Sequence, residues 1–508
     1  MERSAKYSVI SLNSAVFLCG ALVMIYEITG SRIVSPFIGT STYVWTSLIG
    51  TILGALSLGY WIGGRMADKR PDIKVLAGAI FLAGGAVSLT ILLKEVLLSA
   101  IGSAPLGIGI KAVLASLFLF APASVLLGFV TPYAAKLRIS SLDISGRTVG
   151  RLYALSTVGS IVGTFAAGFL LIPFVGSVRT LYLIAALLFV VSISLAAFSL
   201  NRSNVAVIIL FILAISLNEM SSYYLLKTAG LHDIDTEYSR VQVFRTTDPR
   251  SGRPIQAMAI DPYFTQSAVF LDSDELVFDY NKYYDLAEHF KPGKRNSLMI
   301  GGAGYSYPKH YLETFANSTM DVVEIDPKMT EIAGEFFRLT SDPRLKSIHA
   351  DGRVFLNSAP SKKYDAVLMD AFGSLFTVPY QLTTIEAVRE IDRVLVDDGV
   401  VIFNVGSSLT GEGSRFFQAE FKTYQQIFPR VYVFKVNQEH GDERLQNLMI
   451  VACKSGNKIG LENSDPALAD LLSHAVNYEN VVELPVLTDD LAPVEYYNSI
   501  AQDVYLRD

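Results

Sequence analysis

Long apolar runs fill the first 220 residues of the chain, whereas short apolar and polar stretches alternate in the remainder. An α-helix needs roughly 20 apolar residues to cross the hydrocarbon core of a bilayer. The pattern therefore predicts an amino-terminal helical domain, residues 1–226, that lies in a lipid bilayer. Seven runs have about this length: 9–28, 43–64, 75–93, 111–131, 153–173, 180–200 and 204–224.

Two stretches of this domain depart from the simple pattern. Asn218 and Glu219 interrupt the seventh run, which makes it the least regular. Residues 96–110 are apolar but short and contain Pro105, which predicts a re-entrant or interfacial segment rather than a crossing. We therefore expect about seven transmembrane helices.

The pattern changes to short alternating stretches after residue 235. Residues 238–244, 255–260 and 267–271 alternate apolar and polar positions, and Asp-Pro pairs separate them. Such stretches predict antiparallel strands. With a helical pattern over 275–290, they define a small β subdomain at 235–290.

Strand and helix patterns then alternate over residues 291–508, which predicts a mostly parallel sheet covered by helices on both faces. The last two strand patterns, 431–436 and 448–452, follow each other without a helix. They predict an antiparallel pair at one edge of the sheet. This Rossmann-like arrangement is typical of class I S-adenosylmethionine-binding folds, and of methyltransferases in particular, rather than of dinucleotide dehydrogenases.

A glycine cluster follows the first strand of this α/β pattern. The segment Ser297-Leu-Met-Ile-Gly-Gly-Ala-Gly-Tyr305 enters a helical pattern, and Asp321-Val-Val-Glu-Ile-Asp-Pro327 follows about twenty residues later. Glycines allow the backbone to approach a ligand, and an acidic residue at the end of the next strand can accept hydrogen bonds from a ribose. The two segments together predict a nucleoside-type ligand.

Composition narrows the classes of function. The chain has 508 residues, 51% of them hydrophobic, and a net charge of −6, which argues against nucleic acid as the main partner. Its two cysteines, Cys19 and Cys453, lie in different regions and define no disulfide framework. Six scattered histidines form no zinc-ligand pattern, and the sequence has no P-loop and no Ser-His-Asp pattern. We therefore expect neither a metal site nor a hydrolase.

The basic residues between the apolar runs predict an orientation, because cytoplasmic loops are rich in Lys and Arg. Eleven basic residues fall on the side of the amino terminus and five on the other: Arg3, Lys6, Arg65, Lys69, Arg70, Lys74, Lys136, Arg138, Arg147, Arg151 and Arg202 against Arg32, Lys94, Lys111, Arg179 and Lys227. Seven crossings would then place the carboxy-terminal domain outside the cytoplasm. A cytosolic nucleoside cosubstrate requires that domain inside. An even number of crossings would reconcile the two, through a seventh run that only dips into the membrane or an eighth crossing at 96–110. The eighth crossing would also reverse the later basic loops, so we favour the first and expect an inner-membrane protein whose soluble domain is cytoplasmic.

Residues 235–500 resemble the spermidine/spermine synthase family of polyamine aminopropyltransferases, and the whole chain resembles the membrane-fused bacterial members of that family. The resemblance rests on the glycine turn and on four further motifs: Val323-Glu-Ile-Asp-Pro327, Ala350-Asp-Gly-Arg353, Tyr364-Asp-Ala-Val-Leu-Met-Asp370 and Leu487-Thr-Asp-Asp-Leu-Ala-Pro-Val-Glu495. It implies polyamine biosynthesis by a transferase that uses decarboxylated S-adenosylmethionine and an amine. Homodimers are common in the family, so the resemblance also implies a dimer.

The resemblance assigns a role to each matching position. It implies that Gly301, Gly302 and Gly304 line the cosubstrate, that Glu324 binds the ribose, and that Asp351 and Gly352 contact the adenine. It further implies that Asp370 is the catalytic aspartate and that Gln266 lies near the tail of the cosubstrate. Tyr280 matches the tyrosine of a Tyr-His-Glu motif and, with Tyr305, is a candidate for substrate binding.

Four positions depart from the family pattern where it recognises a diamine. Gly304 replaces an aspartate, Asn281 and Lys282 replace the His-Glu of the tyrosine motif, and Gly373 replaces a second aspartate after Asp370. A dication needs several carboxylates to offset its desolvation. The sequence therefore predicts cosubstrate binding but no ordinary recognition of putrescine. Tyr305, Tyr307, Phe372 and Phe376 suit a larger or less charged substrate, or they simply pack the loops.

Three functions remain open. The first is a membrane-anchored enzyme resembling aminopropyltransferases that acts on an amine other than putrescine. The second is a methyltransferase on the same fold, with S-adenosylmethionine itself as the methyl donor. The third is a transporter or sensor whose soluble domain binds a nucleoside without turnover; the stretch Gly63-Gly-Arg-Met-Ala-Asp-Lys-Arg70 resembles a loop of major-facilitator transporters. Asp370 separates them, since only the enzymes need its carboxylate.

Overall fold

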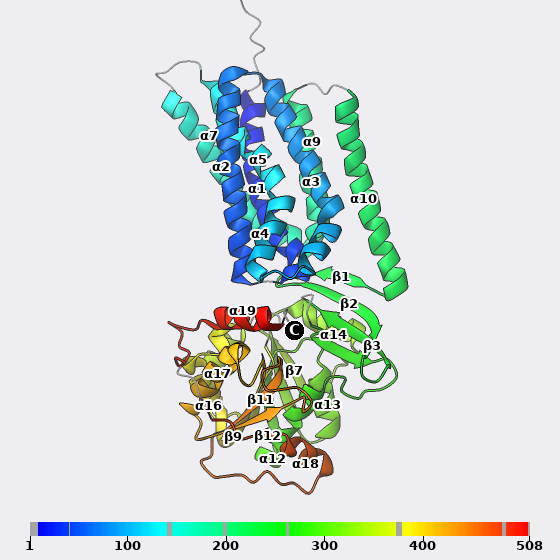
Figure 1. Ribbon diagram of the computed structural model, residues 1–508, viewed down its shortest axis with the longest axis vertical. Helices are drawn as coiled ribbons and strands as arrows, with labels where there is room; N and C mark the ends of the chain where they lie inside the picture. The colour runs from blue at the N-terminus through cyan, green and yellow to red at the C-terminus, as the bar shows by residue number, and fades with distance from the viewer. Residues whose placement is uncertain are drawn as a thin grey trace, which may run out of the picture. The chain divides into compact units, whose positions relative to one another are not determined.

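A computed structural model describes residues 9–39, 41–139, 145–196, 201–260, 264–371, 378–479 and 484–505. The chain divides into two compact units (Figure 1): the amino-terminal unit, Met1–Val241, and the carboxy-terminal unit, Gln242–Asp508. The division falls within strand β2 (Arg240–Thr247).

The amino-terminal unit is a bundle of helices, and each predicted apolar run lies on them within the described residues. Six helical segments are long and apolar enough to cross a membrane, and a seventh crossing follows if one bent helix pair counts as a span. The helices are α1 (Val9–Ile38), α2 (Thr42–Lys69), α3 (Ile73–Gly102), α4 (Ile108–Leu119), α5 (Ala121–Gly128), α6 (Val130–Arg138), α7 (Ser145–Ala166), α8 (Ile172–Val175), α9 (Ser177–Leu195) and α10 (Arg202–Ala229).

The bent pair consists of α4 and the continuous segment formed by α5 and α6, at an angle of 53°. Pro122 at the start of α5 lacks the N–H that would continue the helix, which explains the break. The pair runs from one end of the bundle to the other. At one end Lys111 donates to the carbonyl of Gly102 (2.7 Å), and at the other Lys136 pairs with Asp68 (2.7 Å).

The predicted re-entrant segment at 96–110 is wrong over its first half. Residues 96–102 continue α3 without a break, and only the turn from Ser103 to Gly107 separates α3 from α4. An unbroken helix through these residues satisfies the backbone N–H and C=O groups internally, as an apolar environment requires.

The carboxy-terminal unit begins with a small sheet. β2, β3 (Pro254–Ala259) and β4 (Ser267–Phe270) pair antiparallel, as predicted, in a sheet of order β1-β2-β3-β4. β1 (His232–Asp235) was not predicted. The predicted helix over 275–290 is shorter and is broken into α11 (Asp279–Lys282), a 3₁₀ turn (Tyr283–Asp285) and α12 (Leu286–Phe290).

The predicted α/β pattern forms one eight-stranded sheet of order β12-β10-β11-β9-β8-β5-β6-β7. Its strands are β5 (Asn296–Ile300), β6 (Thr319–Glu324), β7 (Leu345–His349), β8 (Tyr364–Met369), β9 (Leu395–Ser407), β10 (Arg430–Lys435), β11 (Gln446–Cys453) and β12 (Ala475–Val476). β5 to β9 pair parallel, and β10 and β11 pair antiparallel, as the absence of a helix between them predicted.

Helices follow the parallel strands: α13 (Ser306–Thr314), α14 (Pro327–Phe336), α15 (Gly352–Ser358), α16 (Ile385–Val394) and α17 (Arg415–Gln425). Further along the chain lie α18 (Pro466–Ser473) and α19 (Val494–Tyr505). The central strands β5, β8 and β9 are almost completely buried, which explains their continuous apolar runs. Ligands bind at the carboxyl ends of strands in such sheets, and the predicted site residues follow β5, β6, β7 and β8 there.

Candidate active site at the carboxyl edge of the sheet

The glycine turn after β5 and the aspartate after β8 are in direct contact. The N–H of Asp370 donates to the carbonyl of Ile300 (2.9 Å). Gly301 has φ +96°, and a Cβ there would lie 2.2 Å from the carbonyl oxygen of Asp370. Only glycine fits this position, because a side chain would collide with the backbone. The turn is thereby held directly beside Asp370.

Glu324 connects the end of β6 to the glycine turn. Its Oε2 accepts from the N–H groups of Gly302 (2.9 Å) and Ala303 (3.0 Å), and its Oε1 accepts from the N–H of Asp326 (3.0 Å). Only 8% of Glu324 is exposed. Glu324, which the sequence predicts to bind a ribose, therefore also holds the backbone of the glycine turn, which would face the same ligand.

Asp351 caps the amino terminus of α15. Its Oδ1 accepts from the N–H groups of Arg353 (2.9 Å) and Val354 (3.0 Å), and the Nε2 of Gln381 lies 3.5 Å from Oδ2. A Cβ at Gly352 would lie 2.8 Å from Cγ2 of Ile300, so this glycine brings α15 close to β5. Asp351 thus has a structural role, while Oδ2 keeps acceptor capacity for a ligand donor.

Asp370 lies among polar groups from three elements. The hydroxyl of Tyr280 donates to its Oδ2 (3.3 Å), and Nδ2 of Asn404 donates to its Oδ1 (3.1 Å). Tyr284 packs beside them and donates to the carbonyl of Met369 (3.0 Å). Burial raises the pKa of Asp370 to about 6, although hydrogen bonds from Asn404, Tyr280 and Tyr284 oppose this shift. A carboxylate with this pKa is suited to accept a proton near neutral pH.

This environment predicts the pH dependence of activity. With Asp370 as the proton acceptor, its carboxylate form would be the reactive one, so kcat/KM should fall as pH drops through about 6, where the group protonates. Asn404→Leu and Tyr280→Phe each remove a donor that stabilises the carboxylate. Both variants should therefore move this acidic limb to higher pH. Steady-state kinetics between about pH 5 and 9 would measure the position of the acidic limb. A limb that stays at the same pH in both variants would contradict Asp370 as the proton acceptor.

Gln266 carries an unpartnered buried atom near this edge. Its N–H donates to the carbonyl of Met258 (2.8 Å), while its side-chain Oε1 is buried without a hydrogen-bond partner among the described residues. An orphaned buried acceptor is costly unless a ligand or water completes it. Gln266 therefore fits a ligand that donates a hydrogen bond, such as the ammonium group on the tail of a sulfonium cosubstrate.

Tyr305 does not face the site. Its side chain is fully buried in the hydrophobic core, its ring lies against Gly302, and its hydroxyl bonds Oγ1 of Thr330 (2.9 Å). The predicted substrate contact by Tyr305 is therefore wrong. Tyr307 is also buried and donates to Asp285 (3.0 Å), so both tyrosines pack the loops. Phe372, Gly373 and Phe376 lie outside the described residues.

Sequence reasoning missed Asn404 and its partner Asn447. Nδ2 of Asn447 donates to Oδ1 of Asn404 (2.9 Å), which fixes the amide so that its Nδ2 faces Asp370. One signal was available: Asn404 is a polar residue inside the otherwise apolar run Val400-Val-Ile-Phe-Asn-Val405. A buried polar group in a strand needs a partner, and here the partner is the carboxylate of Asp370.

Comparison with known proteins identifies the region that contains these residues. Residues 267–442 match the family model for the spermine/spermidine synthase domain. This region is similar to a spermine/spermidine synthase domain. This confirms the predicted resemblance, and with it the predicted class of enzyme, a transferase. Among the described residues, no group of three or more His, Cys, Asp or Glu side chains is arranged to hold a metal ion.

Several curated relatives of the chain are aminopropyltransferases, and one, of Mus musculus, is an eEF1A lysine and N-terminal methyltransferase, 27% identical over 150 residues. The chain is 28% identical to a polyamine aminopropyltransferase of Vibrio vulnificus over 289 residues, which cover 56% of this chain and 92% of the relative. It is 24% identical to polyamine aminopropyltransferase 1 of Streptomyces coelicolor over 432 residues, 77% of this chain and 75% of the relative. Since the carboxy-terminal unit is about half of the chain, the second alignment includes part of the amino-terminal unit.

A solved structure also matches the chain, with low sequence identity and a low TM-score. A probable spermidine synthase from Corynebacterium glutamicum is 19% identical, with a TM-score of 0.40, and the match covers 48% of this chain and 85% of that one.

Proposed function

We propose that the chain is a membrane-anchored aminopropyltransferase that transfers the aminopropyl group of decarboxylated S-adenosylmethionine to an amine. The observation that carries this proposal is the position of Asp370, directly beside the glycine turn and within hydrogen-bond reach of Tyr280 and Asn404. The turn, Glu324 and Asp351 would hold the nucleoside, and Gln266 would accept from the ammonium group of the donor.

The reaction needs a deprotonated amine and an in-line approach to carbon. The amine nitrogen donates its lone pair to the carbon attached to sulfur, a C–N bond forms, and the electrons of the C–S bond pass to sulfur. The product is a neutral thioether, and the proton leaves the nitrogen. Asp370 would accept that proton, and Tyr280 and Asn404 would keep its carboxylate oriented.

Ligand preference tests the donor. Calorimetry on the full-length protein should show that decarboxylated S-adenosylmethionine and its product, methylthioadenosine, bind more tightly than S-adenosylmethionine and its product, S-adenosylhomocysteine. The opposite preference would favour a methyltransferase. No binding of any of the four would overturn both enzyme functions and leave a non-catalytic role.

We propose further that the amino-terminal unit crosses a membrane seven times. Six segments meet the length and apolarity of a span, and the contacts at both ends of the α4–α6 pair support its counting as a seventh. The aligned region of the Streptomyces coelicolor aminopropyltransferase extends into this unit, which supports a helical anchor shared with a curated relative.

With seven crossings, the chain enters and leaves the helical bundle on opposite faces of the membrane. Nine of the eleven basic residues are described, and they lie at or next to the ends of α2, α3, α6, α7 and α10: Arg65, Lys69, Arg70, Lys74, Lys136, Arg138, Arg147, Arg151 and Arg202. The chain leaves the unit at the other end, where Asp235 accepts from the N–H and hydroxyl of Ser177 (both 2.7 Å) and Arg32 donates to the carbonyl of Glu237 (2.6 Å). A cytoplasmic carboxy-terminal unit needs an even number of crossings, and six would result if the bent pair were re-entrant. The contacts at both ends of that pair support seven crossings instead. We propose the orientation that the charges favour, with the basic end in the cytoplasm. In this orientation the sulfonium donor has to reach the carboxy-terminal unit on the opposite side of the membrane.

Cysteine labelling tests this orientation. The two native cysteines are buried, and a Cβ at Gly146 or Gly456 would meet nothing within 4 Å, so Gly146→Cys and Gly456→Cys are matched reporters. In intact cells an impermeant maleimide should label Gly456→Cys, and Gly146→Cys only after permeabilisation. Labelling of both cysteines from the same side of the membrane would contradict seven crossings. Labelling of Gly146→Cys in intact cells, and of Gly456→Cys only after permeabilisation, would place the carboxy-terminal unit in the cytoplasm.

A further inference from the structure

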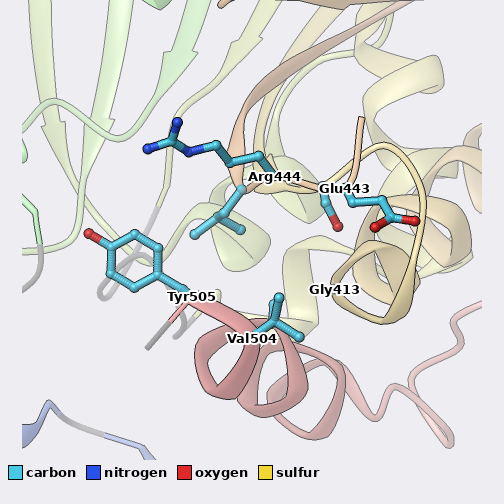
Figure 2. A pocket seen from close by; sticks show the side chains of 8 residues that line it. Gly413, Glu443, Arg444, Val504 and Tyr505 are labelled. Carbon is cyan, nitrogen blue, oxygen red and sulfur yellow. The ribbon is translucent and has the colours of Figure 1, made fainter. Parts of the chain in front are cut away.

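A pocket of about 310 Å³ opens in the carboxy-terminal unit. Figure 2 shows Arg444 and Tyr505 extending along one side of it and Glu443 along the other. The guanidinium of Arg444 has no ion pair or side-chain hydrogen bond among the described residues, and neither has the carboxylate of Glu443. The complete lining is Ser408, Gly413, Glu443, Arg444, Leu445, Ala501, Val504 and Tyr505.

Two strands connect this pocket to Asp370. β9 carries Asn404, which donates to Asp370, and reaches the pocket at Ser408; β11 carries Asn447 and follows directly after Arg444 and Leu445. Four residues of extended strand cover roughly 13 Å. The pocket therefore lies about one elongated small molecule away from the reactive carboxylate.

A second contact places the pocket near the predicted tail of the cosubstrate. The ring of Tyr505, at the end of α19, contacts that of Phe264 at a tilt of 45°, with 5.6 Å between the ring centroids, and Phe264 lies two residues before Gln266. In addition, Ser408 is 1% exposed and its hydroxyl oxygen has no partner among the described residues. An unpaired hydroxyl and an unpaired guanidinium at one pocket can both donate to an anion.

The pocket holds the guanidinium of Arg444 as well as the carboxylate of Glu443, whereas a diamine requires carboxylates at both ends. Gly304 stands where the family has an amine-binding aspartate, and its N–H donates to the hydroxyl of Ser267 (3.0 Å), so that position is used within the fold. The far end of the acceptor would instead meet Arg444. A free guanidinium disfavours a second ammonium group and pairs bidentately with a carboxylate.

We infer that the acceptor is an elongated amine with a carboxylate at its far end, bound by Arg444 while its amino nitrogen faces Asp370. The inference rests on the proposed aminopropyl transfer. Glu443 on the opposite side of the pocket is placed to accept from an amino group next to that carboxylate, so an amino-acid terminus fits as well.

Three acceptors of equal chain length test the far end: 8-aminooctanoate, octylamine and 1,8-diaminooctane, with 4-aminobutanoate as the short control. Full-length protein with decarboxylated S-adenosylmethionine should show the highest kcat/KM for 8-aminooctanoate. Arg444→Gln should lower that value roughly 10- to 100-fold, the worth of one charge-assisted contact, and leave octylamine unchanged. Arg444→Lys should restore part of it.

Arg389→Gln is the matched control, because Arg389 is an exposed arginine on α16. It should change none of the four values. Preference for the diamine in the unmodified protein, or an equal effect of Arg444→Gln on all acceptors, would overturn the inference and leave the transferase intact. Absence of thioether product with every acceptor, 1,4-diaminobutane included, would overturn the transferase and this inference with it.

Discussion

Asp370→Asn should lower kcat by about 10²- to 10⁴-fold, the usual contribution of a positioned general base. The amide keeps the size of the side chain but cannot accept the proton of the amine. Because Asp370 contacts the turn through its backbone, whose N–H donates to Ile300, the substitution should leave the turn in place. Turnover measured as thioether release, with calorimetric binding of the same thioether, separates the two effects.

A surface variant that also removes one carboxylate serves as the control for Asp370→Asn. Asp397→Asn removes an exposed carboxylate that pairs with Lys362 and should change neither turnover nor binding. If Asp370→Asn retained most of the activity, proton acceptance by this residue would be excluded. If it lost thioether binding together with turnover, Asp370 would be a binding group instead.

Glu324→Gln should weaken binding of the thioether product by at least about 10-fold and also lower the melting temperature. Glu324 accepts three backbone N–H bonds, two of them from the glycine turn. Glutamine has only one acceptor oxygen, so its amide group would face an N–H donor on one side. Each hydrogen bond to a charged group contributes about 1.5–3 kcal/mol, and losing part of this set affects the fold and the ligand together.

Glu331→Gln on α14 provides the comparison for Glu324→Gln. Glu331 is exposed and pairs only with Lys328 one turn away, an arrangement of small energetic worth. Differential scanning measurements and calorimetry on both variants should separate them clearly. Unchanged affinity and melting temperature in Glu324→Gln would contradict the proposed dual role of this carboxylate.

The sequence allowed most of the sheet to be predicted because the central strands are buried on both faces and read as continuous apolar runs. The antiparallel pair β10 and β11 was predictable for a similar reason, since too few residues separate the two strands for a crossover helix. The unbroken continuation of α3 through residue 102 could not be predicted. Residues 96–102 and the turn after them form one apolar stretch with Pro105, and this stretch resembles a separate short segment.

The site was predictable only where its residues belong to short motifs. Gly301, Glu324 and Asp370 follow neighbouring strands, and the common edge of a parallel sheet brings them together. Asn404 lies 34 residues after Asp370, and only the register of β8 and β9, in which Met369 pairs with Phe403, places it beside the aspartate. Tyr305 follows the glycines directly, yet its left-handed backbone (φ +54°) accompanies a side chain that lies in the core rather than at the edge.

The most direct test of the central claim is the identity of the spent cosubstrate after turnover. Purified full-length protein is incubated with an amine and either decarboxylated S-adenosylmethionine or S-adenosylmethionine, and the thioether and the modified amine are identified by mass spectrometry. Aminopropyl transfer predicts methylthioadenosine and an aminopropylated amine, formed from the decarboxylated donor and lost in Asp370→Asn. Release of S-adenosylhomocysteine with a methylated acceptor, or no thioether from either donor, would contradict it.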